Sequence, residues 1–259
     1  MCRGRRRARW LVEAACQKAG FARPPIRMAS PSLNCRFIAA VSSVCEGKQA
    51  TDERTDEMRR LGIVEFLTLD GVMQGFGGPD EDREGGFEHG GWGAPYATEE
   101  IGQRAGEGMG AITAYLFGRK TYEHMAAHWP NEPDENPIAR HLNATPKYVV
   151  TRTLTSLDWA GSQVLDGDVV ESVIDLKSES DGSITVLGSG ELVQTLIEHG
   201  LIDDYRLFVH PLVLGSGKRL FRETSRLLPL RLVDCAPTST GILMLHYEAA
   251  GSASSSWTR

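Results

Sequence analysis

Residues 183–221 form the stretch that most constrains the fold of this chain of 259 residues. The stretch begins with an apolar run rich in β-branched residues, 184–187, passes through the glycine turn 188–190 and enters a helical pattern over 191–199. A second apolar run, 205–214, predicts another strand. This order predicts a βαβ unit, which is typical of sheets with parallel strands. Because only a turn separates strand from helix, the first N–H groups of the helix should lie where phosphate binds well.

Charge is distributed unevenly along the chain. Residues 1–50 contain ten Lys/Arg and two Asp/Glu, a net charge of +8, whereas residues 51–259 contain 18 and 32, a net charge of −14. A body this acidic repels nucleic acids and anionic membrane surfaces, so we expect neither as a partner. An anionic ligand must therefore be bound by local donors rather than by the overall field.

The cysteines and the N-terminal segment indicate in which cellular compartment we expect the protein. Four of the five cysteines lie within the first 45 residues and none forms a CxxC pair, which favours a reducing compartment and a cytoplasmic protein. Residues 1–57 are rich in Arg, Ala and Ser and show no sustained periodicity, so we expect an extension without a packed fold. This composition permits an organelle-targeting peptide, a start codon assigned too early, or a basic arm that binds nucleic acid. Residues 250–259 are rich in serine, and we expect a frayed tail.

Strand and helix patterns alternate over residues 58–249, which we expect to form one domain. Strands are expected at 62–69, 114–117, 147–151, 162–165, 230–236 and 241–249, and helices at 98–111, 118–128, 138–143 and 168–177. The alternation predicts an α/β domain, and the last two strands predict a closing antiparallel hairpin on a mixed, mostly parallel sheet.

Residues 75–93 form a long loop with eight glycines, and four large or aromatic side chains are interspersed among them: Phe76, Phe87, His89 and Trp92. A loop of this length is either a lid over a site or a disordered segment. The aromatic rings favour the lid, because a linker has no need of large apolar side chains.

Six separated motifs occur in an order that resembles the dihydrofolate reductase-like family. They are Leu67–Gly71, Leu116–Tyr122, His128–Pro130, Val149–Arg152, Val186–Gly190 and Phe208–Gly217. The resemblance covers roughly residues 58–249 and is strongest to the branch that includes the reductase domain of the bacterial riboflavin-biosynthesis protein. It implies a three-layer α/β/α fold, NADPH as cofactor, a small-molecule substrate and a homodimer.

The resemblance also implies which residues bind NADPH. The phosphates would meet Gly118, Arg119, Lys120 and Thr121. The 2′-phosphate would lie near Thr151 and Arg152. The pyrophosphate would be wrapped by Gly188, Ser189, Gly190, Glu191 and Leu192. Two helix N-termini would then supply N–H donors, and two arginines would supply the charge that distinguishes NADPH from NADH.

On the substrate side we single out Asp70 and Trp92. Asp70 is our candidate for a catalytic or substrate-orienting role, although an Asp-Gly turn explains it equally well. His210 is interpreted as a core or bulge residue rather than as a proton donor. The turn 215–218 resembles an anion-binding loop, yet a simple turn needs the same glycines. His124 and His128 have metal-ligand spacing but no third ligand nearby, so we predict no metal.

One departure from the family affects the mechanism. True dihydrofolate reductases use a buried carboxylate on the first helix, whereas residues 102–106 here read GQRAG, and none of the flanking Glu99, Glu100 and Glu107 can be assigned that role. The leading hypothesis is an NADPH-dependent oxidoreductase related to riboflavin biosynthesis, resembling 5-amino-6-(5-phosphoribosylamino)uracil reductase and acting on a small heterocyclic or ribitylamino-pyrimidine-type substrate. The alternative is a non-catalytic NADPH-binding or regulatory protein of the same fold.

Overall fold

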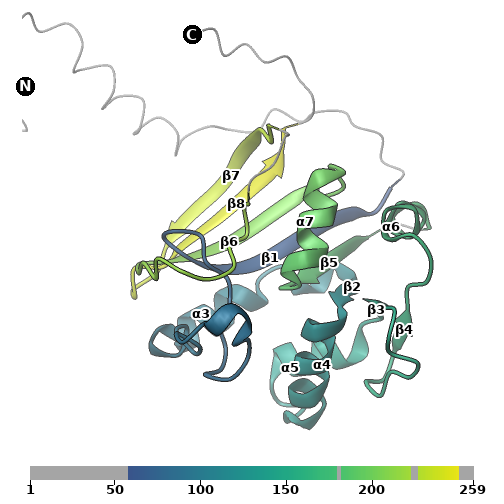
Figure 1. Ribbon diagram of the computed structural model, residues 1–259, viewed down its shortest axis with the longest axis horizontal. Helices are drawn as coiled ribbons and strands as arrows, with labels where there is room; N and C mark the ends of the chain where they lie inside the picture. The colour runs from purple at the N-terminus through teal and green to yellow at the C-terminus, as the bar shows by residue number, and fades with distance from the viewer. Residues whose placement is uncertain (1–57, 180–181, 223–226, 251–259) are drawn as a thin grey trace, which may run out of the picture. The chain divides into compact units, whose positions relative to one another are not determined.

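The computed structural model describes residues 58–179, 182–222 and 227–250. Within these ranges eight strands form one sheet in the order β4-β3-β2-β5-β1-β6-β8-β7 (Figure 1). The strands are β1 (Arg60–Thr68), β2 (Ile112–Gly118), β3 (Lys147–Val150), β4 (Ser162–Val164), β5 (Ser183–Leu187), β6 (Asp204–His210), β7 (Leu230–Pro237) and β8 (Leu243–Ala249). The predictions for the N-terminal extension and for residues 251–259 lie outside the described residues.

Most neighbouring strands are parallel. β1 lies between β5 and β6 and runs parallel to both, which completes the predicted βαβ unit with β1 inserted between its two strands. β2 pairs in parallel with β5 and β3, and β3 with β4. β8 runs antiparallel to β6 and to β7. The predicted mixed, mostly parallel sheet with a C-terminal antiparallel hairpin is confirmed.

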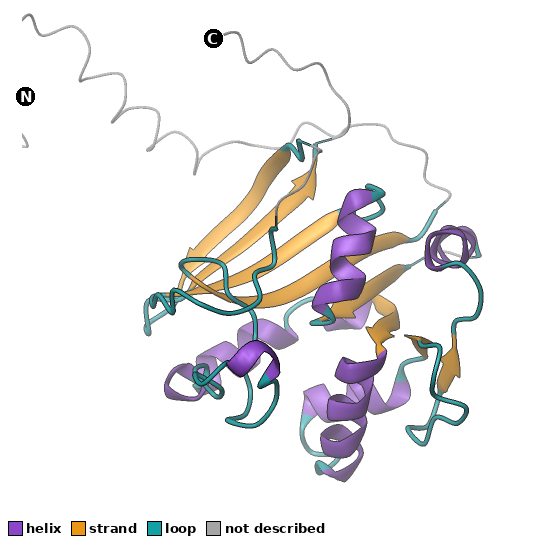
Figure 2. Ribbon diagram, viewed as in Figure 1, coloured by secondary structure: helices purple, strands orange, loops and turns teal. Residues whose placement is uncertain are grey.

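Helices cover both faces of this sheet (Figure 2). The α-helices are α3 (Glu99–Gly106), α4 (Arg119–His128), α5 (Pro137–Ala144), α6 (Val169–Ser178) and α7 (Gly190–Glu198). Short 3-10 turns are η1 (Glu84–Gly86), η2 (Ala94–Tyr96), η3 (Met109–Ala111) and η4 (Trp129–Asn131). Side chains of β2 alternate between two clusters: Leu116 packs with residues of α6 and α7, and Phe117 packs with residues of α4 and α5. The three-layer α/β/α arrangement is therefore confirmed.

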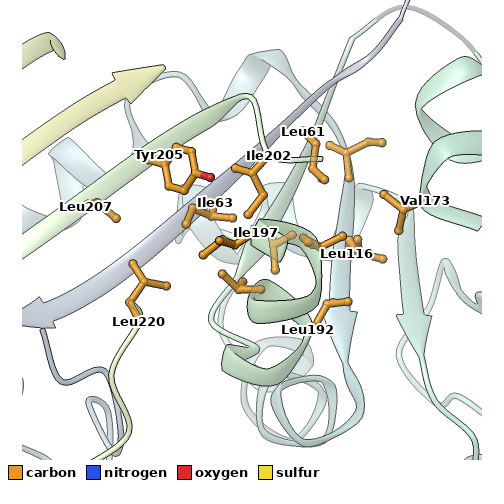
Figure 3. Packing of buried hydrophobic residues seen from close by; sticks show 14 of the residues in the cluster. Leu61, Ile63, Leu116, Val173, Leu192, Ile197, Ile202, Tyr205, Leu207 and Leu220 are labelled. Atoms are coloured by element: carbon orange, nitrogen blue, oxygen red, sulfur yellow. The ribbon is translucent and has the colours of Figure 1, made fainter. Parts of the chain in front are cut away.

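The larger core cluster lies beneath α7 (Figure 3). Leu192, Val193, Leu196 and Ile197 share one face of this helix and are buried against β1, β5 and β6. Burying each such side chain contributes about 1.5–3 kcal/mol, so this face fixes the start of α7 relative to the strand ends.

Two predicted elements are shorter than expected. The helix expected over 98–111 ends at Gly106, because Gly108 adopts the left-handed conformation (φ +79°) and only the turn η3 follows. The strand expected over 205–214 ends at His210, because Pro211 has no N–H to donate and Leu212 N donates back to His210 O.

Residues 75–93, predicted to be a lid or a disordered segment, form a packed loop. Phe87 and Trp92 are buried in a cluster with Val72, and Trp92 Nε1 donates to Gln74 O at 2.7 Å. In the part of the chain that the structure describes, none of the helices has the length and apolar character needed to cross a membrane.

Candidate functional site

Two glycine junctions meet at one edge of the sheet. Because β2 and β5 are adjacent and parallel, their carboxyl ends lie together, and Gly118 N donates to Ser189 Oγ at 2.9 Å. A Cβ on Gly188 would lie 3.4 Å from Thr121 Cγ2. The structure thus brings together the starts of α4 and α7, as the sequence predicted.

Ser189 has a strained backbone at this junction. Its φ of +65° is the only positive φ of a non-glycine residue in the described ranges. Such a conformation costs about 1–2 kcal/mol for an L-residue, and strain of this kind gathers at functional sites. The Ser189 hydroxyl accepts the Gly118 N–H and does not cap α7, so the seryl side chain ties the two junctions together.

The starts of α4 and α7 lack side-chain caps from the described residues. The other three α-helices in those residues are each capped by a side-chain oxygen, from Thr98, Asn136 and Asp168. Uncapped N–H groups at a helix start are suited to an anion, because they carry the positive end of the helix dipole.

The start of α7 offers backbone rather than side chains. Leu192 is buried in the core, and the exposed Glu191 is paired with Arg222 at 2.6 Å. A Cβ on Gly190 would lie 3.1 Å from Met73 Sδ, so the segment after β1 crosses the start of this helix. Residues 190–192 can therefore serve a ligand only through their N–H groups.

The start of α4 adds two exposed cations. Arg119 pairs with Glu123 one turn along the helix at 2.9 Å. Lys120 Nζ contacts Glu84 Oε2 of η1 at 2.7 Å. Exposed pairs of this kind are worth about 0–1 kcal/mol, so both side chains are available to a stronger anion.

Thr151 and Arg152 follow β3 directly. Val150 pairs with Gly118, so β3 delivers these two residues beside the start of α4. Thr151 Oγ1 accepts from Thr153 N and Leu154 N at 3.2 and 3.1 Å, which fixes the turn. Arg152 forms no ion pair or side-chain hydrogen bond with any described residue, so its guanidinium can bind a ligand.

Asp70 connects the turn after β1 to the segment after β6 through hydrogen bonds. Its carboxylate accepts from Thr68 Oγ1 at 2.6 Å, Leu214 N at 3.2 Å and Gly215 N at 2.9 Å. The Thr68 hydroxyl and these N–H groups lower the pKa of Asp70 to about 2. Asp70 is therefore ionised at neutral pH and holds the segment after β6 against the end of β1. Its predicted catalytic and substrate-binding roles stay predictions.

Trp92 belongs to an aromatic cluster on the α3 face of the sheet. Phe66 is stacked between Phe76 and Phe208, at centroid distances of 4.3 and 4.7 Å. Trp92 meets His210 edge-on at 5.1 Å. The cluster packs the Trp92 ring within the protein.

His210 is a core residue, as predicted. It is 1% exposed, and its Nδ1 lies 3.2 Å from Leu67 O and 3.0 Å from Phe208 O. Two carbonyl acceptors require an N–H at Nδ1, so we assign the proton there. Burial lowers the pKa of this histidine, and the ring is neutral at neutral pH.

No carboxylate of α3 points into the fold. Ile101 is the buried residue of this helix, and Glu100 binds Ser239 at the surface. Glu65 of β1, which the sequence patterns did not single out, is 2% exposed and receives no hydrogen bond at Oε1 from the described residues. Burial raises the pKa of Glu65 to about 8. In the sequence, Glu65 could have been found as an acidic residue at a strand position that the alternating pattern assigns to the core.

The ion-pair partners of Lys218 could not be predicted from the sequence either. Its Nζ contacts Asp82 Oδ2 and Glu84 Oε2, both at 2.7 Å. It lies in the turn 215–218 that resembles an anion-binding loop. In the described ranges, His, Cys, Asp and Glu side chains form no cluster of three or more that could hold a metal ion.

Comparison with known proteins places the chain in a family. Residues 61–244 match the RibD C-terminal domain. The uncharacterized protein YyaP of Bacillus subtilis (strain 168) is 28% identical over 202 residues, which cover 75% of this chain and 97% of YyaP. The uncharacterized protein YwjB of the same strain is 27% identical over 139 residues, covering 54% of this chain and 75% of YwjB.

A solved structure shows the same fold. It is a protein of Shewanella sp. PV-4 whose name assigns it provisionally to riboflavin biosynthesis, with a TM-score of 0.51 and 16% identity. The similarity covers 73% of this chain and 98% of the Shewanella chain. With its matched residues spanning the sheet, the helices and both glycine junctions, the chain belongs to the RibD C-terminal domain family.

Proposed function

We propose that the protein is an NADPH-dependent reductase that transfers hydride to a small heterocyclic or ribitylamino-pyrimidine-type substrate. The observation that carries this proposal is the pairing of two uncapped helix starts through the 2.9 Å contact of Gly118 N and Ser189 Oγ. Two sets of unpaired N–H groups at one sheet edge suit the linked phosphates of a dinucleotide. Membership of the RibD C-terminal domain family supports the same activity.

The residues present fit NADPH. The N–H groups at the starts of α4 and α7 would bind the pyrophosphate, with Lys120 adding charge. Arg152 would bind the 2′-phosphate, because its guanidinium has no acidic partner among the described residues and follows the strand next to α4. When bound, NADPH supplies the hydride; the chain supplies position, orientation and exclusion of water.

On the substrate side, Phe76 and Phe208 cover both faces of the Phe66 ring, so this ring packs the loop after β1 and leaves no face for a heterocycle. Asp70 would orient the substrate through its ionised carboxylate. A pKa of about 2 leaves Asp70 without a proton to donate at neutral pH, so it is an orienting group rather than an acid.

Replacing Arg152 with alanine tests the cofactor assignment. We expect NADPH to bind about tenfold more weakly or worse while NADH affinity stays unchanged, because a lost charge-assisted hydrogen bond costs about 1.5–3 kcal/mol. Arg140→Ala is the matched control, since Arg140 is also exposed but lies on α5. Equal losses for NADPH and NADH would refute the assignment, and no binding of NADPH at millimolar concentration to the unmodified protein would refute the reductase.

The second candidate is a non-catalytic NADPH-binding or regulatory protein. The absence of a carboxylate among the buried residues of α3 favours it. Binding of NADPH without oxidation across a panel of pterins, pyrimidines and quinones would support this candidate, whereas turnover of any of them would exclude it. Under either function we propose a cytoplasmic homodimer, for which the edge strand β7 is a candidate interface. Analytical ultracentrifugation at several concentrations tests the dimer.

A further inference from the structure

The carboxylate of Glu84 links three segments near the start of α4: the turn η1, the first turn of α4 and the loop after β6. Glu84 Oε2 accepts from Lys120 Nζ and from Lys218 Nζ, each at 2.7 Å. Lys120 belongs to the first turn of α4, and Lys218 belongs to the loop after β6. Two ammonium groups from segments about one hundred residues apart thus converge on a single oxygen of η1.

This carboxylate engages the ammonium groups of Lys120 and Lys218, which a phosphate group near the start of α4 could otherwise use. The lysines hold the pKa of Glu84 at about 2, so an anion stays at this position throughout the neutral range. A second charged pair, Arg222 with Glu191 in the first turn of α7, lies within electrostatic range of both Glu84 and Lys218. The bridge therefore lies close to both uncapped helix starts.

The turn that carries Glu84 is anchored through its backbone, whereas its two glycines border open space. Gly85 and Gly86 have φ values of +70° and +77°, and a Cβ on either would meet nothing within 4 Å. Gln74 Nε2 donates to Glu84 O at 3.0 Å, which anchors the backbone but leaves the side chain to the lysines. A cleft of about 370 Å³ opens beside the bridge, lined by the glycines of this turn and by residues 216–218.

The contact is weak enough to exchange. The side chains of Glu84 and Lys120 are 58% and 62% exposed, and that of Lys218 is 28% exposed. Exposed ion pairs contribute little, whereas a diphosphate offers two charges and several acceptor oxygens to the same donors. With Glu84 withdrawn, Lys120, Lys218 and Arg222 face two remaining carboxylates, Asp82 and Glu191, which leaves a net positive charge.

We propose that Glu84 is an internal competitor for a diphosphate site formed by Lys120 and Lys218, and that a dinucleotide must displace it to reach the starts of α4 and α7. The inference rests on the proposed function for the identity of the ligand. It adds Lys218 to the site and gives the loop 75–93 a regulatory role. Removing the charge of Glu84 should tighten binding rather than weaken it.

The experiment is a calorimetric titration of inorganic pyrophosphate into the full chain and its variants. We expect Glu84→Gln to bind pyrophosphate about fivefold more tightly than the unmodified protein, because two exposed ion pairs no longer compete. Glu88→Gln is the matched control: Glu88 is exposed on the same loop but contacts neither lysine. It should leave the affinity unchanged.

The double variant Glu84→Gln/Lys218→Met tests whether the effects of Glu84 and Lys218 on pyrophosphate binding are coupled. We expect the gain from Glu84→Gln to be lost when Lys218 is absent. An unchanged affinity in Glu84→Gln, an equal gain in Glu88→Gln, or a gain that persists without Lys218 would each overturn the proposal.

Titrating NADPH into the same variants separates this inference from the proposed function. If pyrophosphate follows the expected pattern but NADPH binds to none of the variants, the competitor role of Glu84 stands and the cofactor assignment falls. If NADPH and pyrophosphate bind equally well to the unmodified protein and to Glu84→Gln, the competitor role falls and the reductase stands.

Discussion

The starts of α5 and α6 differ from those of α4 and α7 in how their N–H groups are satisfied. Asn136 Oδ1 accepts from Ile138 N and Ala139 N, and Asp168 Oδ1 accepts from Val170 N and Glu171 N, at 2.9–3.4 Å. At α4 and α7 the equivalent positions are Gly118 and Ser189, and no side chain of the described residues caps either helix. The starts of α5 and α6 are satisfied by side chains, whereas the first N–H groups of α4 and α7 have no capping side chain among the described residues.

This difference in capping affects stability. A side-chain cap contributes about 1 kcal/mol, so the start of α4 or α7 gives up that stabilisation. The strained φ of Ser189 adds a further cost at the same place. Both costs fall at the carboxyl ends of β2 and β5, where α/β sheets bind their ligands.

Converting the uncapped start of α4 into a capped one should produce the largest effect, a loss of NADPH affinity. Gly118 has φ −80° and ψ 159°, which suits a capping residue, and a Cβ there would lie 3.6 Å from Ser189 Cβ. In Gly118→Asp the new carboxylate would cap α4 and repel phosphate. We expect NADPH affinity to fall at least about a hundredfold, measured by fluorescence titration, with little change in stability. Gly118→Asn, which caps without charge, should lose less, and unchanged affinity in Gly118→Asp would contradict the site.

Glu65 is a buried contrast to the helix starts, because its carboxyl caps no helix and receives no hydrogen bond at Oε1 from the described residues. Its folded-state pKa of about 8 exceeds the ordinary value of 4.5, so the folded state holds a proton between these pH values. Stability should therefore fall as pH rises through this interval, by at most about 1.4 kcal/mol per pH unit. Urea unfolding of Glu65→Gln at pH 5, 6.5 and 8 should lack this slope. An identical slope in both proteins would show that Glu65 is not its source.

Removing a structural cap should have a smaller effect. Asp168→Ala deletes the oxygen that accepts two N–H groups of α6, and we expect a loss of about 1 kcal/mol in the free energy of unfolding. Thermal denaturation measures it, and Asp168→Asn should recover most of the loss. NADPH affinity should not change in either variant; a weaker affinity would mean that capped and uncapped starts are not independent.

The sequence predicted what local patterns can encode. Alternating apolar residues and the glycine turns located the strands and helices, and the order of the motifs located Gly118 beside Ser189. The exact ends of α3 and β6 were missed because Gly108 and Pro211 act through conformation rather than through hydropathy.

Long-range pairing was beyond the sequence. Glu84 and Lys218 are separated by 134 positions, and nothing local in either segment indicates the other. From the sequence, a turn residue and a substrate-site residue were equally good interpretations of Asp70. Only the positions of Leu214 N and Gly215 N reveal what its carboxylate binds. The stacking of Phe66 between Phe76 and Phe208 likewise arises from the packing of the loop after β1 on the sheet.

Amide hydrogen exchange with and without NADPH tests whether the starts of α4 and α7 bind the cofactor, because it reports on the N–H groups themselves. We expect NADPH to slow exchange in the first turns of α4 and α7, residues 119–122 and 190–193, and to leave the capped first turns of α5 and α6 unchanged. Binding of NADPH without protection at α4 and α7, or with equal protection at all four helix starts, would contradict this expectation.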